Sequence, residues 1–428
     1  MATDGEIHRS INAVWRIESA RIIGALARML RDVGTAEELA QDALVAALEQ
    51  WPRDGVPDNP AAWLTATAKH RAIDLLRKRT LHASKEEELG RELDAQHAMA
   101  ADDFAEAVDA ALDDEVGDDL LRLVFTACHP VLSPEARVAL TLRLLGGLST
   151  DEIARSFLVP EATIAQRIVR AKRTLADAQV PFEVPRGDEL AVRLASVLEV
   201  IYLIFNEGYA ATAGEEWLRP ALCEDALRLG RILAELVPAE PEVHGLLALM
   251  EIQASRAHAR VTAAGEPILL LEQNRAQWDQ LLISRGLAAL DHAEKLGGAL
   301  GPYALQAAIA ACHARARTAD ATDWNRIATL YGILARVTPS PIVELNRAVA
   351  VAMAAGPAAG LVLADALITE PALVHYHLLP AVRGDLLLKL GRTDEARAAF
   401  EHAAALAQNT RERELMLGRA GACGGNAA

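Results

Sequence analysis

The sequence predicts an all-α fold. Ala and Leu dominate its 428 residues, aromatic residues make up only 4%, and alternating runs of β-branched residues are scarce. In nearly every long segment, apolar residues instead recur three and four positions apart, which is the period of an amphipathic helix. The chain is long enough for two or three domains with substantial cores.

The first helical unit is expected over residues 13–79. Within it, residues 36–51 (AEELAQDALVAALEQW) carry Ala and Leu along one helical face. The side chains that project elsewhere are Gln41, Asp42 and Val45. Residues 52–60 (PRDGVPDNP) then form a loop, because its prolines, Gly and Asn end one helix and begin the next.

The helix predicted over residues 61–79 (AAWLTATAKHRAIDLLRKR) is apolar on one face and basic on the other. The basic face comprises Trp63, Thr67, His70, Asp74, Arg77 and Lys78, with Lys69 and Arg71 at its margins. An aromatic ring among cations can stack on a base while the cations hold phosphates, as binding of single-stranded nucleic acid requires. A buried Trp beside a solvated basic helix end fits the same pattern equally well.

Residues 84–119 are strongly acidic, with fourteen Asp and Glu against two basic residues. Like charges at this density repel one another, so we expect a flexible linker with transient helix, or simply a solubilising tether. The whole chain has a formal net charge of −16, which argues against an indiscriminate nucleic-acid binder.

A helix-turn-helix is predicted over residues 149–175 (STDEIARSFLVPEATIAQRIVRAKRTL). Ser149 and Glu152 have the spacing of a capping box, in which each side chain satisfies a free backbone N–H at a helix start. Leu158 and Val159 form the turn. Pro160 begins the second helix, where its missing N–H is not needed.

The second helix of this motif has an apolar inner stripe and a polar outer face. The inner stripe is Ile164, Ile168, Ala171 and Leu175; the outer face is Ala162, Gln166, Arg170 and Arg173, flanked by Thr163 and Arg167. In a major groove, Gln can read adenine, and Arg can read guanine or hold phosphates. Residues 137–173 carry seven basic residues against three acidic ones, which favours DNA contact over an ordinary solvated helix.

Residues 179–188 (QVPFEVPRGD) have the composition of a domain boundary, and helix after helix follows without a basic cluster. A repeat is visible near the end, where Gly391 is followed at +5, +9 and +12 by Ala396, Phe400 and Ala403. Small residues at these offsets are typical of tetratricopeptide repeats. We therefore expect stacked helix pairs with a concave surface.

No catalytic, metal or membrane-spanning motif is recognisable. The four cysteines are scattered without a Cys-x-x-Cys pair, and neither residues 128–129 (CH) nor 375–377 (HYH) have enough neighbours for zinc, so we expect no metal, no cofactor and a reducing cytoplasm. Residues 206–209 (NEGY) fit a helix-ending turn better than a polar pocket. Residues 348–364 are uncharged but too short and too interrupted to span a membrane, and residues 1–10 lack the apolar core of a signal peptide.

In order and spacing, these motifs resemble the extracytoplasmic-function sigma factors of bacterial RNA polymerase, in the subgroup with a C-terminal tetratricopeptide-type extension. Residues 125–130 (FTACHP) and 376–379 (YHLL) also look like recurring stretches of that subgroup. The resemblance implies these parts: sigma domain 2 (1–83), an acidic linker (84–119), sigma domain 4 with the helix-turn-helix (120–178), a second linker (179–188) and a repeat-like regulatory domain (189–420).

The resemblance also implies roles for single residues. Gln41, Asp42 and Val45 would face the clamp of core RNA polymerase. For the melted minus-ten element, Asn59 would cradle an unstacked base, and the strand would lie along Trp63, Lys69, His70, Arg71, Arg77 and Lys78. The outer face of the helix-turn-helix would read the duplex minus-thirty-five element. His70 and Leu158 depart from the family pattern, in which Asn and Gly are common at these positions.

The function implied is transcription initiation at chosen promoters by a protein that is not an enzyme. The C-terminal repeat domain would control that activity through an intramolecular contact, a partner protein or a ligand. Two alternatives stay open at this point: a helix-turn-helix regulator with a helical sensor domain, and a protein-binding helical scaffold whose basic helices are incidental.

Overall fold

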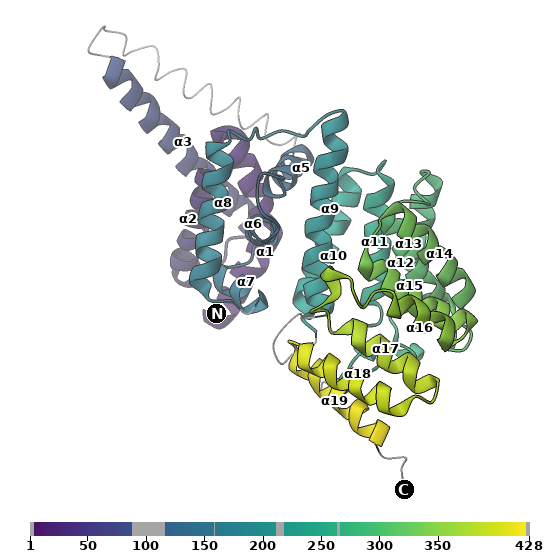
Figure 1. The fold of residues 1–428 in the computed structure, drawn as a ribbon. Coiled ribbons are helices and arrows are strands. Elements are labelled where there is room, and N and C mark those ends of the chain that lie inside the picture. Colours follow the sequence, from purple (N-terminus) through teal and green to yellow (C-terminus); the bar gives the residue numbers. More distant parts are fainter. Residues whose placement is uncertain (1–3, 88–115, 158, 211–217, 263–265, 425–428) are drawn as a thin grey trace. The chain divides into compact units, whose positions relative to one another are not determined.

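A computed structural model of the chain describes residues 4–87, 116–157, 159–210, 218–262 and 266–424. Regular secondary structure in these ranges is helical, apart from one isolated antiparallel bridge between Val261 and Pro267, which confirms the predicted all-α class (Figure 1). Contacts divide the chain into two units, Met1–Val200 and Ile201–Ala428. None of the described helices has both the length and the apolar character that crossing a bilayer would demand.

In the described residues, the first unit comprises seven helices and the first half of an eighth. They are α1 (Asp4–Leu30), α2 (Val33–Asp54), α3 (Pro60–Glu87), α5 (Val116–Ala127), α6 (Pro134–Leu144), α7 (Thr150–Phe157), α8 (Glu161–Asp177) and the first half of α9 (Asp188–Tyr209). The capping residues explain where several of them start. Asp32 accepts hydrogen bonds from the N–H groups of Gly34 (2.8 Å) and Thr35 (3.3 Å), which are free donors at the start of α2.

Alanine forms most of the inward face of α2, whereas the leucines predicted on this face, Leu39, Leu44 and Leu48, are half-buried. Its buried residues are Ala36, Glu37, Ala40, Ala43, Ala46, Ala47 and Trp51. Small side chains let helices approach closely, so that larger residues such as Ile23 of α1 and Leu64 of α3 fill the remaining space. Glu37 is the exception in this row, since it is a buried carboxylate.

The helices α7 and α8 form the predicted helix-turn-helix. The capping box is present in both directions, because Ser149 N–H donates to Glu152 (2.8 Å) and Glu152 N–H donates to the Ser149 hydroxyl (3.1 Å). One detail of the prediction is wrong: Pro160 is the N-cap of α8 and not its first helical residue, since its ψ of 141° is extended. Leu158, assigned to the turn, lies outside the described residues.

The predicted acidic linker lies largely outside the described residues, but both of its ends are helical. Its first residues belong to α3 and its last to α5. Asp119 corrects the picture of a wholly solvated acidic stretch, because it is 2% exposed and pairs with Arg122 (2.8 Å) and Arg28 (3.2 Å). A carboxylate with two cationic neighbours can be buried where an unpaired one could not.

The second unit is a succession of helices, each packed against the next (Figure 1). They are the second half of α9, then α10 (Pro220–Leu236), α11 (Pro241–Ala254), η2 (Ala257–Ala259), η3 (Arg275–Gln277), α12 (Gln280–Lys295), α13 (Pro302–Arg315), α14 (Trp324–Val337), α15 (Pro341–Ala355), α16 (Pro357–Asp365), η4 (Pro371–Leu373), α17 (Leu378–Lys389), α18 (Thr393–Leu406) and α19 (Thr410–Gly424). This order fits stacked helix pairs, and their tetratricopeptide character stays a prediction.

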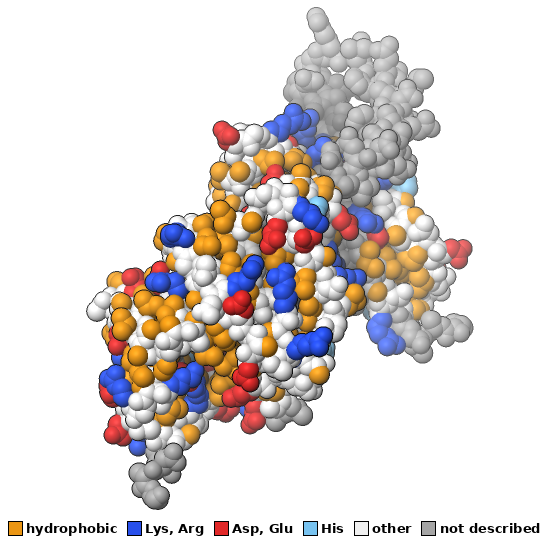
Figure 2. Space-filling view, turned by 90° about the vertical axis from the view of Figure 1, so that its right-hand side faces the viewer, with side chains coloured by type: hydrophobic (Ala, Val, Ile, Leu, Met, Phe, Trp, Pro, Cys, Tyr) orange, Lys and Arg blue, Asp and Glu red, His pale blue; other side chains and the backbone are white. Residues whose placement is uncertain are grey.

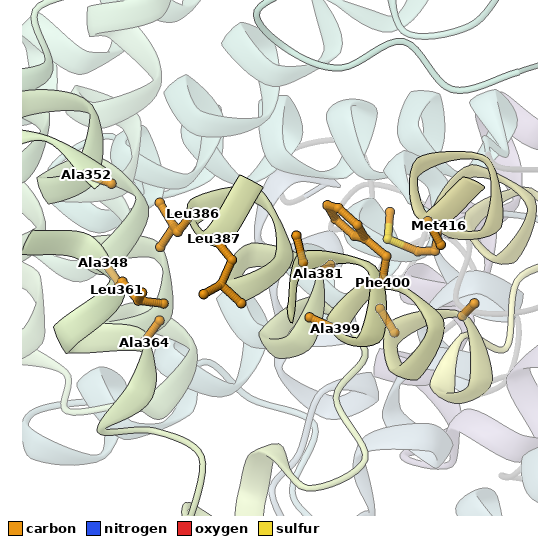
Figure 3. Close-up of a cluster of buried hydrophobic side chains, with 14 residues drawn as sticks. Ala348, Ala352, Leu361, Ala364, Ala381, Leu386, Leu387, Ala399, Phe400 and Met416 are labelled. Carbon is orange, nitrogen blue, oxygen red and sulfur yellow. The ribbon is translucent and has the colours of Figure 1, made fainter. Parts of the chain in front are cut away.

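The residues of the predicted repeat form one cluster around Phe400 (Figure 3). Ala396, Phe400 and Ala403 are fully buried there. Gly384 of α17 faces the same ring, and a Cβ at this position would lie 2.8 Å from it, so the close approach of α17 to α18 requires glycine. The spacing of small residues in the sequence therefore reports helix packing correctly.

Residues 206–209 are still helical and form the last turn of α9, so the helix does end there, at Tyr209, but these four residues do not form a separate turn. Glu207 forms a buried ion pair with Arg219. The Arg260 guanidinium stacks on the Tyr209 ring, 3.5 Å from its centroid, and Arg256 donates a hydrogen bond to the Tyr209 hydroxyl (2.6 Å). These contacts hold the end of α9 within the second unit.

Candidate nucleic-acid interface

The outer face of α8 is open to solvent, and its inner stripe is buried. Ile164, Ile168, Ala171 and Leu175 are all buried, and the outward residues Ala162, Gln166, Arg170 and Arg173 are all exposed, as the periodicity predicted. Thr163 and Arg167 are half-buried at the margin of the face. Nothing in the described part of the first unit covers the four outward side chains.

The ion pair that Arg173 forms on this face is exposed and weak. Arg173 lies 3.4 Å from Asp177, in a pair whose side chains are 81% and 70% exposed. Pairs this exposed contribute little to stability, so Arg173 can exchange its carboxylate for a phosphate. Gln166 and Arg170 are the exposed residues that can donate to base edges.

Val169 is a residue of this face that the sequence reasoning missed. It lies three positions after Gln166 and four before Arg173, and it is 65% exposed. A valine is ordinarily assigned to a core, which is why the pattern did not single it out. An exposed apolar side chain among hydrogen-bonding ones can contact the methyl group of thymine in a major groove.

Lys172 serves a different purpose from the other cations of α8. Its ammonium group forms an ion pair with Glu37 of α2, and its side chain is only 17% exposed. The same carboxylate accepts a hydrogen bond from Arg143 of α6 (2.8 Å). The basic count of this segment therefore overstates the charge available to DNA in this structure.

The basic face of α3 is mixed in character. His70, Arg77 and Lys78 are exposed, whereas Lys69 and Arg71 are half-buried. Arg71 lies 3.2 Å from Asp42 of α2, which connects the helix predicted to bind DNA with the one predicted to bind polymerase. An exposed pair of this kind is weak and can be exchanged for other partners.

Two residues assigned to the melted strand also have structural contacts. Asn59 accepts a hydrogen bond from the Ala62 N–H (3.1 Å) and so caps α3. Trp63 is half-buried and packs edge-on against the buried Trp51, with ring centroids 5.4 Å apart. The interpretation of Trp63 as a packed residue is therefore correct in part, and its role as a stacking ring stays a prediction.

The three residues predicted to contact polymerase lie on the outer side of α2. Asp42 and Val45 are exposed and Gln41 is half-buried. Val45 is 50% exposed, and an exposed apolar side chain beside a carboxylate is suited to a protein partner.

A network of buried polar side chains joins α5 and α6 to the first half of α9. Arg193 donates to the backbone oxygen of Phe125 (2.9 Å), and the Ser196 hydroxyl donates to that of Cys128 (2.6 Å). Arg137 in turn donates to the Ser196 hydroxyl and pairs with Glu199 (2.9 Å). Arg137, Arg193 and Ser196 are all buried, so the start of α9 is part of the domain that carries the helix-turn-helix.

The cysteine and histidine at residues 128–129 belong to this packing. The Cys128 thiol lies 3.3 Å from the Thr141 hydroxyl, and burial raises the pKa of the thiol to about 11. His129 accepts a hydrogen bond from the Val131 N–H (3.1 Å), and burial lowers its pKa. No three His, Cys, Asp or Glu side chains converge as metal ligands within the described ranges.

Basic and acidic side chains are interspersed among hydrophobic ones over the face of the molecule seen in Figure 2. The acidic residues keep these cations from forming a continuous positive surface for a phosphate backbone. On α3 and α8, several cations share one helical face.

Comparison with known protein families finds three matches along the chain. Residues 16–81 match Sigma-70 region 2, and residues 122–175 match Sigma-70, region 4. Residues 193–294 match a family of unknown function (DUF6596). The first two matches coincide with α1–α3 and with α5–α8, and the third begins at Arg193 in the first half of α9.

Similar proteins are found in several bacteria. An uncharacterized protein of Rhizobium meliloti (strain 1021) is 46% identical over 391 residues, covering 91% of this chain and 90% of that protein. The ECF RNA polymerase sigma factor SigK of Mycobacterium ulcerans is 31% identical over 161 residues, 36% of this chain and 78% of SigK. The probable ECF RNA polymerase sigma factor SigI of Mycobacterium tuberculosis is 25% identical over 190 residues, 44% of this chain and 62% of SigI. No solved structure matches.

Proposed function

The chain belongs to the extracytoplasmic-function (ECF) RNA polymerase sigma factors, and from this premise we propose how its surfaces and its C-terminal domain act. As a member of that family it binds core RNA polymerase and promoter DNA, directs transcription initiation, and is not an enzyme. The presence of region 2 before region 4 disfavours the alternatives of a simple helix-turn-helix regulator and of a scaffold.

Promoter reading is assigned to two surfaces. The outer face of α8 takes the duplex minus-thirty-five element, with Gln166 and Arg170 on base edges, Val169 beside a thymine methyl, and Arg167 and Arg173 on phosphates. The basic face of α3 takes the melted minus-ten strand, with Trp63 as the stacking ring and His70, Arg77 and Lys78 on the backbone. The observation that carries this proposal is the uncovered outer face of α8 over a buried stripe.

Polymerase binding is assigned to Gln41, Asp42 and Val45 on α2. Their support is their shared outward position and the exposed apolar surface of Val45. Asp42 also neutralises Arg71 of α3. Engagement of Asp42 by polymerase would therefore free Arg71 for the DNA strand.

The test is reconstituted transcription with core polymerase, the full chain and DNA from its native upstream regions. Replacing both Arg167 and Arg170 with Ala removes two charged contacts, so promoter binding should fall at least about a hundredfold while binding to core polymerase is unchanged. Arg155→Ala is the matched control, because Arg155 is an exposed arginine of α7 that lies off the outer face of α8. Unchanged promoter affinity in the double variant would refute the assignment of this face.

The C-terminal helical domain is proposed to control the activity of the sigma regions. Its support is α9, whose first half is bonded to region 4 by Arg193 and Ser196 and whose end is held in the second unit by Arg256 and Arg260. One helix thus contributes to both units. A partner protein or a ligand of the second unit could act on region 4 through it.

The experiment for this second proposal compares the full chain with a chain that ends after Val200. Ending the chain at Gly187 would be unsuitable, because it would also remove Arg193 and Ser196 from region 4. Control by the C-terminal domain requires the two proteins to differ in promoter-specific transcript per bound polymerase. Equal yields from every native promoter, with equal binding to core polymerase, would exclude it.

A further inference from the structure

Glu37 is a buried carboxylate of region 2 whose partners lie in region 4. It is 4% exposed, and within the described residues its ion pairs are with Arg143 of α6 and Lys172 of α8. A carboxylate placed in the interior without such partners would be strongly unfavourable. The surface of α2 at Glu37 is therefore built to receive cations from another domain.

Further contacts between the two regions surround this one. Arg16 of α1 pairs with the capping-box residue Glu152 (2.7 Å), and Arg28 of α1 pairs with Asp119 of α5 (3.2 Å). The backbone at Gly147, before α7, comes so close to α1 that a Cβ there would lie 2.9 Å from the Ser19 hydroxyl. Region 4 is thus packed onto region 2 by charge and by shape together.

This arrangement cannot read a promoter. The minus-thirty-five and minus-ten elements are named by their positions, which lie about 25 base pairs apart. At about 3.4 Å per base pair, this is roughly 85 Å along the duplex. In the structure, α8 is linked to α2 by a direct ion pair between Lys172 and Glu37. Region 4 must leave region 2 before the outer face of α8 and the basic face of α3 can occupy both elements.

We propose that the Glu37 contact with Arg143 and Lys172 is a latch that holds the free sigma factor closed, and that promoter reading requires it to open. The latch consists of charged side chains. An incoming anion can therefore replace Glu37 as the partner of Arg143 and Lys172, and an incoming cation can replace those two as the partner of Glu37. When it opens, Lys172 becomes available to a DNA phosphate on the flank of α8. A contact that prevents both promoter elements from being read together in the closed state then contributes to DNA binding in the open state.

The latch adds to the family's activity and does not depend on control by the C-terminal domain. It also makes a specific statement about α2. Glu37 lies one helical turn before Gln41, so the latch occupies the end of the helix whose next turns carry the proposed polymerase face. Closing therefore restricts access only around Gln41, which is half-buried, and leaves Asp42 and Val45 exposed.

The direct test is to lock the closed state with a reversible covalent bond. Ser19→Cys combined with Gly147→Cys brings the two sulfur atoms within bonding reach, because a Cβ at residue 147 would lie 2.9 Å from the present Ser19 oxygen. A cysteine at residue 147 must keep the positive φ of the glycine (68°), which strains the oxidised and the reduced protein alike. The full chain is oxidised, the bond between residues 19 and 147 is verified by mass spectrometry, and transcription is measured with core polymerase before and after reduction.

The locked protein should yield at least roughly tenfold less promoter-specific transcript, and reduction should restore it, because only the open form is competent. Each single variant, oxidised in the same way, controls for pairing with the four native cysteines. A verified disulfide with undiminished transcription would overturn the proposal. If the reduced double variant is itself inactive in transcription, promoter binding by its complex with core polymerase is compared before and after reduction, and the oxidised protein should bind more weakly.

A second measurement weakens the latch instead of locking it. Glu37→Gln removes the charge and leaves the shape, so the open fraction should rise and core polymerase should bind roughly tenfold more tightly. Lys172→Gln should have a smaller effect in the same direction, because it removes one ion pair of Glu37 and leaves the one with Arg143. Combining the two should add little to Glu37→Gln, which already breaks both ion pairs. Glu38→Gln is the control, because Glu38 is the exposed neighbour on α2. Unchanged affinity in both variants would contradict the latch.

Discussion

Removal of the Ser196 hydroxyl tests the junction between region 4 and α9. This hydroxyl donates to the Cys128 oxygen (2.6 Å), accepts from Arg137, and is buried. Ser196→Ala deletes one oxygen atom and leaves the helix propensity of α9 intact or better. The variant therefore isolates the hydrogen bonds from any change in fold.

The expected cost follows from the two bonds that are lost. A neutral hydrogen bond contributes about 1 kcal/mol and one from a charged donor about 1.5–3 kcal/mol. Arg137 keeps its ion pair with Glu199 (2.9 Å), so the free energy lost with its hydrogen bond to Ser196 is at the lower end of that range. The sum is about 2–3 kcal/mol, which corresponds to roughly a 30- to 150-fold increase in the equilibrium constant for release of α9 from region 4.

Hydrogen exchange of the full chain measures this release directly. Amide protons in the first half of α9 should exchange faster by that factor in Ser196→Ala, and those of α1 and α2 should not. Val192→Ala is the matched control, because Val192 is on the same helix and is 64% exposed. If Ser196→Ala exchanges no faster than this control, the hydroxyl does not hold α9 and the argument for coupling through it fails.

Three further predictions concern single residues. Glu152→Ala removes the acceptor for the Ser149 N–H and the partner of Arg16, and should lower the free energy of unfolding of the first unit by about 1 kcal/mol, whereas Glu152→Gln should recover most of this in thermal melts. The Cys128 thiol, with its pKa raised to about 11 by burial, should resist alkylation at pH 8 in the native chain and react fully once unfolded, as counted by mass spectrometry. Burial, with Arg256 and Arg275 nearby, lowers the pKa of His313 from 6.5 to about 4. The folded state therefore binds this proton less readily than the unfolded state, and the free energy of unfolding should fall by about 3 kcal/mol as the pH is lowered from 6.5 to 4. Chemical denaturation should show this decline, and His313→Gln should reduce it.

Local patterns in the sequence were sufficient to predict the helix-turn-helix. The capping box needs only Ser149 and Glu152 at the right spacing, and the buried stripe of α8 needs only a period of 3.6 residues. The same holds for the cluster around Phe400, where the spacing of small residues in the sequence indicates that neighbouring helices pack closely. In each case the information lies within a few turns of helix.

Long-range pairing was not predictable in this way. Lys172 was counted with the DNA-binding charges, and Asp119 with the linker acids, although both are committed to partners in region 2. Residues 179–188, with their two prolines, have the composition of a domain boundary, but contacts continue beyond them, since Arg193 and Ser196 donate to the backbone oxygens of Phe125 and Cys128. A single sequence shows where a helix stops and not which surface the next helix meets.

Region 4 is attached to α9 by the network of Arg193 and Ser196 and to α2 by the Glu37 latch. The two attachments differ in whether outside groups can replace their contacts, and this difference determines which opens first. The α9 network ends on the backbone oxygens of Phe125 and Cys128, which stay inside region 4 and cannot be satisfied from outside without removing α9. The Glu37 latch joins side-chain charges, for which polymerase and DNA phosphates supply substitutes. The latch should therefore open while α9 remains attached, and region 4 should move together with the first half of α9. Ser196→Ala and Lys172→Gln then act on separate steps, so their effects on hydrogen exchange should add when the two are combined. A strong departure from additivity would show instead that region 4 releases both neighbours in one step.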